Sequence, residues 1–474
     1  MIWSLSWKNV WRSKKRSMIV IFATTLGVVA GVFAAGLMNG WIQQRVDAAI
    51  YTECSHVKIH NQDYLLNEDI QYTIPGLGKI ENDLKQNPSV VAYSSRLKTM
   101  AMAATSWGNT ALMLEGINLD DEKKVSNLYE KIIPGGGNYF DTEMRNPIVI
   151  SDKTAEYLRI KNYEISNETL DSLKVSGVPE NVITKLIPSK DKRYKTEKIF
   201  RKELTKLLKR KEIKEYGQTI LTVCRHYILR SKIVFTFTGE NGELLYQTFK
   251  VCGVYKTSNT AFDQMNAFVL KDDLAKVLGF SDNDSHEIGI ILNKETSPDD
   301  FCREMRGKYP GISFMSWKDL APDASMMADY MDFYYYVIMG FILFALAFGI
   351  INTMLMAILE RTKELGMLMA IGMNKKRVFR MIMLETIFLT TVGAIVGMVL
   401  GYIVIAITGH TGLNFSSVSE GFEAMGWAAV VYPNIAPGFF LAVTVMVVIT
   451  GILSSIIPAR KALKLNPVEA IRTE

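Results

Sequence analysis

The sequence predicts an α-helical membrane protein with four transmembrane helices and a large α+β extracytoplasmic domain between helices 1 and 2. Four apolar runs are each long enough to cross the hydrocarbon core of a bilayer, which takes about 20 helical residues. One run lies near the start of the chain and three lie in its last third, whereas segment 41–332 has the composition of a soluble domain. The short segments between the runs differ sharply in basic residues, which sets the expected orientation.

The N-terminal segment 1–17 is predicted to be a cytoplasmic helix in the membrane interface. Trp3, Trp7 and Trp11 fall on one helical face with basic residues around them. A basic start followed by an apolar run is also the plan of a signal peptide. The run 18–40 is too long for a signal peptide and no convincing cleavage site ends it, so we expect it to be the first transmembrane helix.

The three further spans follow the outer domain and are predicted at 333–359, 381–408 and 436–457. Basic residues concentrate in three short segments, with five in 1–17, six in 360–380 and four in 458–474. The loop 409–435 has none. By the positive-inside rule, both termini and segment 360–380 are expected in the cytoplasm, and 41–332 and the short external loop 409–435 outside.

The first and third spans carry glycines four residues apart, namely Gly27, Gly31, Gly36, Gly40, Gly393, Gly397 and Gly401. Small residues at this spacing let helices pack closely in lipid. We favour packing within one subunit over homodimerisation. Glu385 is the only charge in the four predicted spans and is therefore a candidate functional residue. Because it lies near the interface, we favour the simpler interpretation that it reaches water or Arg380.

The outer domain is predicted to mix strands and helices. Alternating apolar residues predict strands at 54–61, 90–104, 111–117, 147–150, 232–238, 244–255 and 267–270. A Gly-rich turn at 134–140 and helices at 151–159 and 271–278 complete the pattern. Segments 41–50 and 322–332 are predicted to be helical stalks continuous with the first two spans, so that movement of segment 360–380 could be passed outward.

Residues 160–216 are predicted to be a helical, basic insert in this domain. Twelve Lys plus Arg fall between 190 and 214, and Phe200, Leu204, Leu207 and Leu208 form one apolar stripe. Binding of nucleic acid would require aromatic residues regularly interleaved with the basic ones and a favourable compartment, and neither is indicated. We expect a solvated helix packed by its stripe, with contact to a partner protein or to anionic lipid as the alternative.

Charge and cysteine spacing exclude several function classes. Segment 41–332 holds 39 basic and 41 acidic residues, a net charge of −2, so the positive charge of the chain belongs to its membrane-flanking segments and contact with membrane lipids is expected. The cysteines, Cys54, Cys224, Cys252 and Cys302, match no metal-ligand spacing. We expect small buried residues, although one or two disulfides remain open. The sequence has no P-loop, HExxH or GxSxG motif, so no catalytic, cofactor-binding or metal residue is predicted.

Segment 360–380 is the stretch around which the chain is organised. Leu365, Leu368, Met369 and Gly372 recur at helical spacing, which predicts a helix of one to two turns with an apolar stripe between charged shoulders. Such a stripe requires a partner. An element of the membrane surface is the alternative.

Two motifs resemble a known family. The sequence Arg361-x-x-Glu364-Leu365-Gly366-x-Leu368-x-Ala370-Ile371-Gly372 resembles the segment by which FtsX-like and MacB-type permeases of ABC systems contact their ATPase. Within it, Met369 is a departure, since many members of the family carry Arg at this position. The C-terminal stretch from Pro458 to Arg472 resembles the closing signature of those permeases. The resemblance implies an ATPase-coupling site at Glu360, Arg361, Glu364, Leu365, Gly366, Leu368, Ala370 and Gly372, and a C-terminal family motif that includes Pro458, Ala459, Pro467 and Glu469.

The outer domain extends this resemblance. The order of elements from Pro134 to Arg159 resembles MacB-type permeases, and the stretch from Thr257 to Leu278 resembles most closely the lipoprotein-release (LolC/LolE) subgroup, whereas the insert fits neither. Lipoprotein-release permeases that pass cargo to a soluble chaperone carry an extended loop where this chain has a tight turn at 240–243. That hook is expected to belong to a companion subunit or to be replaced by the basic helix 196–214.

The resemblance implies a permease subunit of a mechanotransmission-like (type VII) ABC complex in the inner (cytoplasmic) membrane. It is expected to couple ATP hydrolysis to lipoprotein release or export. The implied partners are a cytoplasmic ATPase that binds the ATP, a second permease subunit in a homo- or heterodimer, and lipoprotein cargo or a periplasmic protein. The chain itself is not expected to be an enzyme. The alternatives are an FtsX-like regulator of a cell-wall hydrolase, a MacB-type efflux permease, and a membrane-anchored sensor or enzyme without an ATPase.

Overall fold

The computed structural model describes residues 2–12, 14–141, 143–239 and 242–463. They fall into two compact units. The helical unit comprises Met1–Gln44, Met326–Phe415 and Val430–Glu474, and the α+β unit comprises Arg45–Ser325 and Ser416–Ala429.

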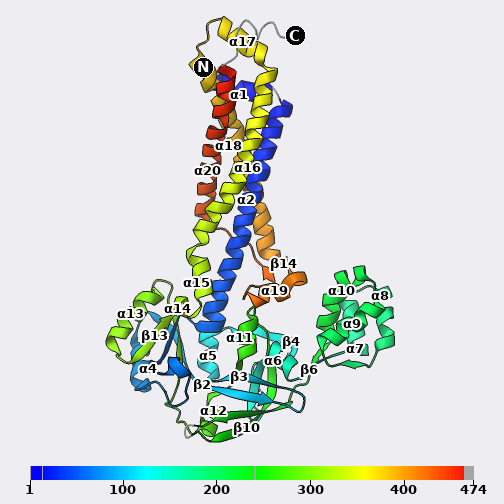
Figure 1. Ribbon diagram of the computed structural model, residues 1–474, viewed down its shortest axis with the longest axis vertical. Helices are drawn as coiled ribbons and strands as arrows, with labels where there is room; N and C mark the ends of the chain where they lie inside the picture. The colour runs from blue at the N-terminus through cyan, green and yellow to red at the C-terminus, as the bar shows by residue number, and fades with distance from the viewer. Residues whose placement is uncertain (1, 13, 142, 240–241, 464–474) are drawn as a thin grey trace. The chain divides into compact units, whose positions relative to one another are not determined.

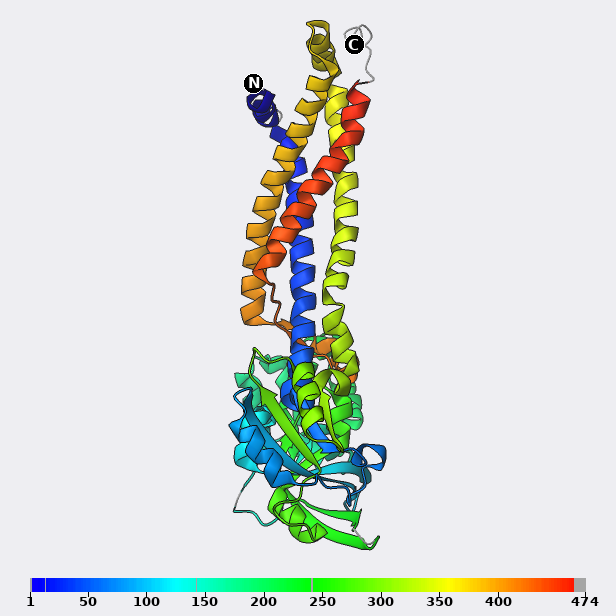
Figure 2. The same ribbon diagram turned by 90° about the vertical axis from the view of Figure 1, so that its left-hand side faces the viewer.

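Four long helices make up most of the helical unit and lie side by side in both views (Figures 1 and 2). They are α2 (Lys14–Ala48), α16 (Met331–Glu360), α18 (Lys375–Thr411) and α20 (Pro437–Leu463). Each is long and apolar enough to cross a membrane. The short helices α1 (Ile2–Arg12) and α17 (Thr362–Ala370) complete this unit. The predicted fold class, four spans and an α+β domain between the first and second, is confirmed.

The glycines of the third span pack against the first span. A Cβ added at Gly393 would come within 2.7 Å of Thr24, one at Gly397 within 2.8 Å of Val28, and one at Gly401 within 3.1 Å of Val32. Without side chains at these positions, α18 and α2 approach closely enough for the Thr25 hydroxyl to donate a hydrogen bond of 3.1 Å to the Gly393 carbonyl. The glycine spacing therefore serves packing within one subunit, as favoured from the sequence.

The α+β unit contains a ten-stranded sheet. Its neighbouring strands follow the order β13-β1-β12-β2-β3-β11-β5-β10-β4, and β9 pairs with both β10 and β2. The strands are β1 (Val57–Asn61), β2 (Val90–Ala104), β3 (Asn109–Ile117), β4 (Ile132–Gly137), β5 (Pro147–Ser151), β9 (Lys232–Thr238), β10 (Leu244–Tyr255), β11 (Asn266–Leu270), β12 (Glu287–Leu292) and β13 (Ile312–Ser316). The second pairing of β9 closes β2, β3, β11, β5, β10 and β9 into a ring.

Short helices cover two separate cores. One core lies between strands β1, β12 and β13 and two helices, and the other fills the strand ring and contacts two more helices. The helices of this unit outside the insert are α3 (Tyr64–Asn67), α4 (Leu77–Gln86), α5 (Leu119–Val125), α6 (Asp152–Tyr157), α11 (Thr260–Met265), α12 (Lys271–Leu278), α13 (Pro298–Lys308), α14 (Trp317–Leu320), α15 (Pro322–Asp329) and α19 (Ser419–Ala424). Strand β2 belongs to both halves, because its first part pairs with β12 and its second part with β3.

Three local predictions were wrong. The strand expected at 54–61 begins only at Val57, because Ala49–Cys54 forms a π-helical turn after α2. The Gly-rich stretch expected as a turn is partly strand β4, which pairs with the end of β10. The second stalk is not one continuous helix with its span, since α15 ends at Asp329 and Tyr330 separates it from α16.

The insert has its own fold and is longer than predicted. It runs from β6 (Lys161–Glu164) through α7 (Asn167–Val175), α8 (Glu180–Leu186), β7 (Arg193–Tyr194), α9 (Glu197–Leu207) and α10 (Arg210–Val223) to β8 (Arg225–Tyr227). Its helices gather in one group in Figure 1. Both short strands pair with β6, and the predicted stripe residues Phe200, Leu204 and Leu208 are buried in a core that belongs to the insert alone. The stripe therefore packs internally.

All four cysteines are buried and none is in a disulfide. Burial raises the pKa of the Cys252 thiol to about 11 and those of Cys224 and Cys302 to about 12. Thiols with such high pKa values are mostly protonated and unreactive. The cysteines are small buried residues, as expected.

Candidate functional site

The predicted coupling residues lie on α17 and on the residues that flank it. Arg361 leaves the helical conformation (φ −101°, ψ 16°) and separates α16 from α17. Gly372 has a φ of 98°, which glycine adopts without strain, and this lets the chain reverse after α17. The Asn374 side chain then accepts a hydrogen bond of 3.0 Å from the backbone N–H of Lys376 and caps α18. Consequently, the second half of segment 360–380 is the start of the third long helix.

Helix α17 has one face in the helical core and one face exposed. Leu365 and Gly366 are buried, and Leu368 packs partly against the same core. Ala370 and Gly372 are exposed. The structure thus divides the predicted coupling residues between two opposite faces, and the apolar stripe around Leu365 has its partner within the chain.

Two apolar residues missed in the sequence dominate the exposed face. Met367 is 51% exposed and Ile371 is 85% exposed. They are four residues apart and therefore lie next to each other on the helix surface. This spacing was visible in the sequence. The stripe through Leu365 is equally regular, however, and the sequence analysis assigned the contact face to that stripe. The surface formed by Met367, Ala370, Ile371 and Gly372 is called the α17 surface below.

A chain of ion pairs fixes the position of α17. The Arg361 Nη1 lies 3.1 Å from Glu385 Oε1 on α18, and the Arg361 Nε lies 3.0 Å from Glu364 Oε2. Glu364 also forms an ion pair with Arg12 of α1, whose Nη2 lies 2.6 Å from Glu364 Oε1. The interpretation that Glu385 reaches Arg380 or water was wrong. Its partner is Arg361, because the break after α16 turns this guanidinium toward α18.

Helix α1 packs on α18 through its aromatic face. The rings of Trp3 and Trp7 lie 5.6 and 5.4 Å from that of Phe388 in edge-to-face arrangements. The Ser6 hydroxyl donates a hydrogen bond of 3.3 Å to the Met381 carbonyl. Trp3, Trp7 and Trp11 remain substantially exposed, as suits a helix that lies at a membrane interface.

The remaining predicted residues are placed as follows. Glu360 ends α16 and is exposed. Pro458 lies inside α20, and Ala459 is fully buried in the helical core. Pro467 and Glu469 lie outside the described residues. Throughout the described ranges, no group of three or more His, Cys, Asp or Glu side chains is arranged to hold a metal ion.

A buried charge network in the α+β unit was not foreseen from the sequence. Arg96 contacts Glu122 at 2.8 Å and Glu287 at 2.7 Å, and Glu287 also contacts Lys58 and Lys98, each at 3.1 Å. Although burial alone would raise it, these cations hold the pKa of Glu287 well below its usual range. Arg96 is the last residue of β2 that pairs with β12, so the network stabilises the point where the two halves of the sheet meet.

The two ends of the α+β unit are also joined. Arg45 contacts Glu53 at 2.9 Å and Asp323 of α15 at 3.0 Å, and its guanidinium is almost fully buried. A further pair, Lys256 with Glu423 at 2.8 Å, fastens residues of the predicted external loop 409–435 to the strand region. Part of that loop therefore belongs to the outer domain.

Comparison with known proteins identifies the C-terminal region. Residues 336–467 match the family model described as FtsX-like permease C-terminal. This region is similar to the C-terminal domain of FtsX-like permeases. It includes α17, Arg361 and Glu385, so the candidate site lies inside the matched region.

Sequence similarity to two ABC transporter permeases covers about half of the chain. The chain is 24% identical over 258 residues to the uncharacterized ABC transporter permease YknZ of Bacillus subtilis, covering 52% of this chain and 60% of that protein. It is 25% identical over 242 residues to the uncharacterized ABC transporter permease MJ1507 of Methanocaldococcus jannaschii, covering 50% and 58%. The macrolide export ATP-binding/permease protein MacB of Rhodopirellula baltica is 34% identical over 139 residues, 29% of this chain and 18% of that protein. The chain thus spans about 60% of the length of its first two relatives.

Two solved structures align with this chain at low similarity. The extracellular domain of the YknZ transporter aligns with a TM-score of 0.29 and 14% identity, covering 55% of this chain and 99% of that domain. The periplasmic region of MacB from Actinobacillus actinomycetemcomitans gives a TM-score of 0.29 and 9% identity, covering 58% and 94%. The lipoprotein-release subgroup stays a prediction, since none of these proteins is named for that activity.

Proposed function

We propose that this chain is the permease subunit of an FtsX/MacB-type ABC complex and that a separate cytoplasmic ATPase docks on the α17 surface. The observation that carries the proposal is the two-faced environment of α17. Its inner face is buried and its N-terminal end is held by ion pairs, yet Ile371 and Met367 present an apolar surface. A helix held in this way can be moved by a bound ATPase while it keeps its contacts with the spans on either side.

Movement of α17 would act directly on two spans. Arg361 follows α16 immediately in the chain and contacts α18 through Glu385. An ATPase that binds one position of α17 more tightly would shift the equilibrium between conformations of the spans. A shift from 1:99 to 99:1 requires about 5.5 kcal/mol of differential binding. ATP binds to the partner in this scheme, and the permease contributes no catalytic or cofactor-binding residue.

The activity that we favour is lipoprotein release or export at the cytoplasmic membrane, by a homo- or heterodimer of permease subunits. The second candidate is transmission of the same motion to an extracytoplasmic cell-wall hydrolase. The order of elements in the outer domain resembles that of lipoprotein-release permeases and therefore favours lipoprotein release or export. Cargo captured by the outer domain would distinguish the two, because a hydrolase and a lipoprotein differ in lipid modification.

The docking proposal is tested by Ile371→Asp. A carboxylate at this exposed position leaves the fold intact but would have to be desolvated in an apolar interface, so we expect loss of ATPase copurification. Ile371→Val is the matched control, because it keeps the surface apolar. Leu365→Asp should instead lower the thermal midpoint of the isolated permease, since Leu365 is buried. Retention of the ATPase by Ile371→Asp at the wild-type level would refute docking at this surface.

A further inference from the structure

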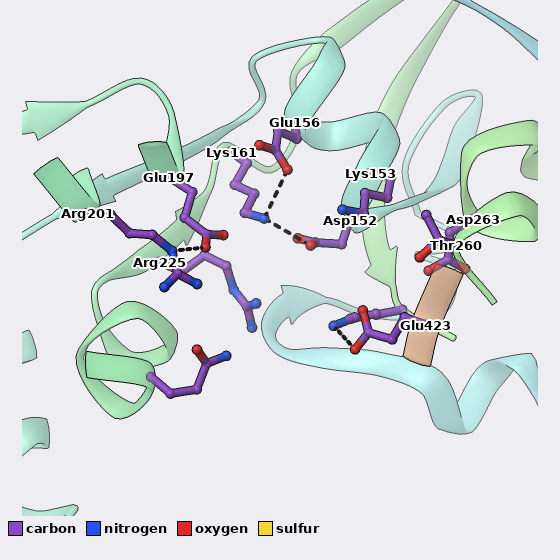
Figure 3. Close-up of a pocket in the computed structure, with 12 residues that line it drawn as sticks. Asp152, Lys153, Glu156, Lys161, Glu197, Arg201, Arg225, Thr260, Asp263 and Glu423 are labelled. Atoms are coloured by element: carbon purple, nitrogen blue, oxygen red, sulfur yellow. Dashed lines mark hydrogen bonds and ion pairs between the residues drawn. The ribbon is translucent and has the colours of Figure 1, made fainter. Parts of the chain in front are cut away.

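A charged cleft of about 80 Å³ lies within the α+β unit, walled by the insert, α6, α11 and α19 (Figure 3). Ten of its twelve lining residues are ionisable, five cations and five carboxylates. A single ordered water needs only about 10–15 Å³ of such space, so the cleft has room for a small ion with several atoms.

Most of these charges are already paired. The pairs are Lys161 with Asp152 at 2.9 Å, Arg201 with Glu197 at 2.6 Å, and Lys256 with Glu423 at 2.8 Å. Glu156 lies 3.7 Å from Lys161, and the buried Asp263 accepts hydrogen bonds from the backbone N–H and the hydroxyl of Thr257. Every carboxylate of the cleft therefore has an ion-pair or hydrogen-bond partner.

Two cations are left over. Within the described part of the chain, neither Arg225 nor Lys153 has a carboxylate at ion-pair distance, and both are half-buried. Arg225 lies over the ring of Tyr227, 5.4 Å from its centroid, which orients the guanidinium without neutralising it. Figure 3 shows this side chain extending into the open part of the cleft, between the Arg201–Glu197 pair and Glu423. A guanidinium in this position retains free N–H donors.

We propose that the cleft binds a small, singly charged oxyanion, held by Arg225 with Lys153 as the second cation. The planar fork of a guanidinium matches two oxygens of a carboxylate or of a phosphate ester. A single negative charge suits a wall in which cations and carboxylates are equal in number, whereas a dianion would be repelled by Glu197 and Glu423. The anion could be a dissolved carboxylate or the phosphodiester of a lipid headgroup, which share this chemistry.

Binding would link the insert to the rest of the unit. Arg225 comes from strand β8 of the insert, whereas Lys153 lies on α6, which is attached to the strand ring. An anion held by both would bridge them. The insert would then serve as one wall of a binding site.

The test is titration of the full-length protein in detergent with acetate and, separately, with dimethyl phosphate, at constant ionic strength set by chloride. Saturable heat of binding and a rise in thermal midpoint are expected for wild type. Arg225→Gln should weaken binding at least about tenfold, the loss expected for one charge-assisted hydrogen bond. Lys153→Gln should weaken it less. Lys232→Gln, an exposed cation outside the cleft, is the matched control and should bind as wild type.

The two titrants separate the sources of the anion. Binding of both indicates a general oxyanion site, and binding of dimethyl phosphate alone indicates a lipid headgroup. Arg225→Lys keeps the charge without the fork and provides a folded variant if the glutamine variant is unstable. It should bind more weakly than wild type and more tightly than Arg225→Gln. Absence of saturable binding in wild type, or equal binding by wild type and both Arg225 variants, would overturn the proposal.

Discussion

Arg361 and Glu385 form an ion pair of 3.1 Å that joins the end of α16 to α18, although 24 residues separate them in the sequence. Both side chains are mostly buried, at 18% and 12% exposure. A carboxylate in a membrane helix is costly unless it is paired, so the ion pair stabilises both residues.

Removal of one partner should therefore destabilise the permease. We expect Glu385→Gln and Arg361→Gln each to cost about 1–3 kcal/mol, between the values for exposed and fully buried pairs. The thermal midpoint of the purified protein in detergent measures this loss. The double variant should be less destabilised than the sum of the single variants, because each single variant already breaks the pair. Strictly additive losses would show that the pair contributes no interaction energy.

Close packing between α2 and α18 gives a second prediction. Gly397→Val adds a side chain where even a Cβ would come within 2.8 Å of Val28 and 2.9 Å of the Thr25 carbonyl oxygen. We expect a loss of about 1–3 kcal/mol from overpacking, seen as a lower thermal midpoint. Gly340→Val is the matched control, since nothing lies within 4 Å of a Cβ added at Gly340 of α16. Equal effects of the two substitutions would contradict the packing assignment.

The spans were predictable because their signal is local. An apolar run of sufficient length identifies a membrane helix without knowledge of its neighbours. Strand β2 was predicted with its observed bounds for the same reason, since its alternation extends over many residues. Strand β4 was missed because its Pro-Gly-Gly-Gly sequence has no strand character, and only pairing with β10 makes it extended.

Contacts between distant residues were not predictable. The sequence offered Arg380, five residues from Glu385, as the nearest basic partner, but the break at Arg361 places a more distant guanidinium there. Glu287 meets Lys58 and Arg96 only after β1, β2 and β12 have paired. The end of the insert was placed too early, at residue 216. Strand β8 has only three residues, and only its pairing with β6 shows that it belongs to the insert.

Asp263 should make the stability of the outer domain depend on pH. Burial raises the pKa of its carboxyl to about 7, although hydrogen bonds from Thr257 and the nearby Lys256 oppose the rise. The unfolded chain releases this proton near pH 4. Between about pH 4 and 7 the folded state thus binds the extra proton, so its contribution to the free energy of unfolding decreases as pH rises and then levels off.

The variant Asp263→Asn isolates this contribution from that of other titrating groups. The neutral amide should make the protein more stable than wild type at pH 8, and this advantage should shrink toward pH 5. Thermal midpoints of both proteins across this range measure the difference. An asparagine variant that follows the wild-type pH profile in parallel would show that Asp263 does not titrate in this interval.

The last prediction concerns removal of the insert, whose two ends meet. The backbone N–H of Ile228 donates a hydrogen bond of 2.9 Å to the carbonyl of Ile160. Excision of 161–227 with a short Gly-Ser bridge should therefore leave the strand ring closed. Excision of 166–215 alone should not be tolerated, because it divides α10 and removes Phe200 and Leu204 from the core that supports β8.

The complete excision also removes both partners of Asp152, since Lys161 and Tyr227 belong to the insert. Asp152 would then be a carboxylate without its partners beside the strand ring, so the shortened protein is also made with Asp152→Ser. We expect this variant to have a cooperative thermal transition close to wild type, and the version that retains Asp152 to be several degrees lower. If the stable variant keeps its ATPase and transfers cargo normally, the insert does not replace a chaperone hook. If it keeps its ATPase but loses one outer partner, that partner binds the insert.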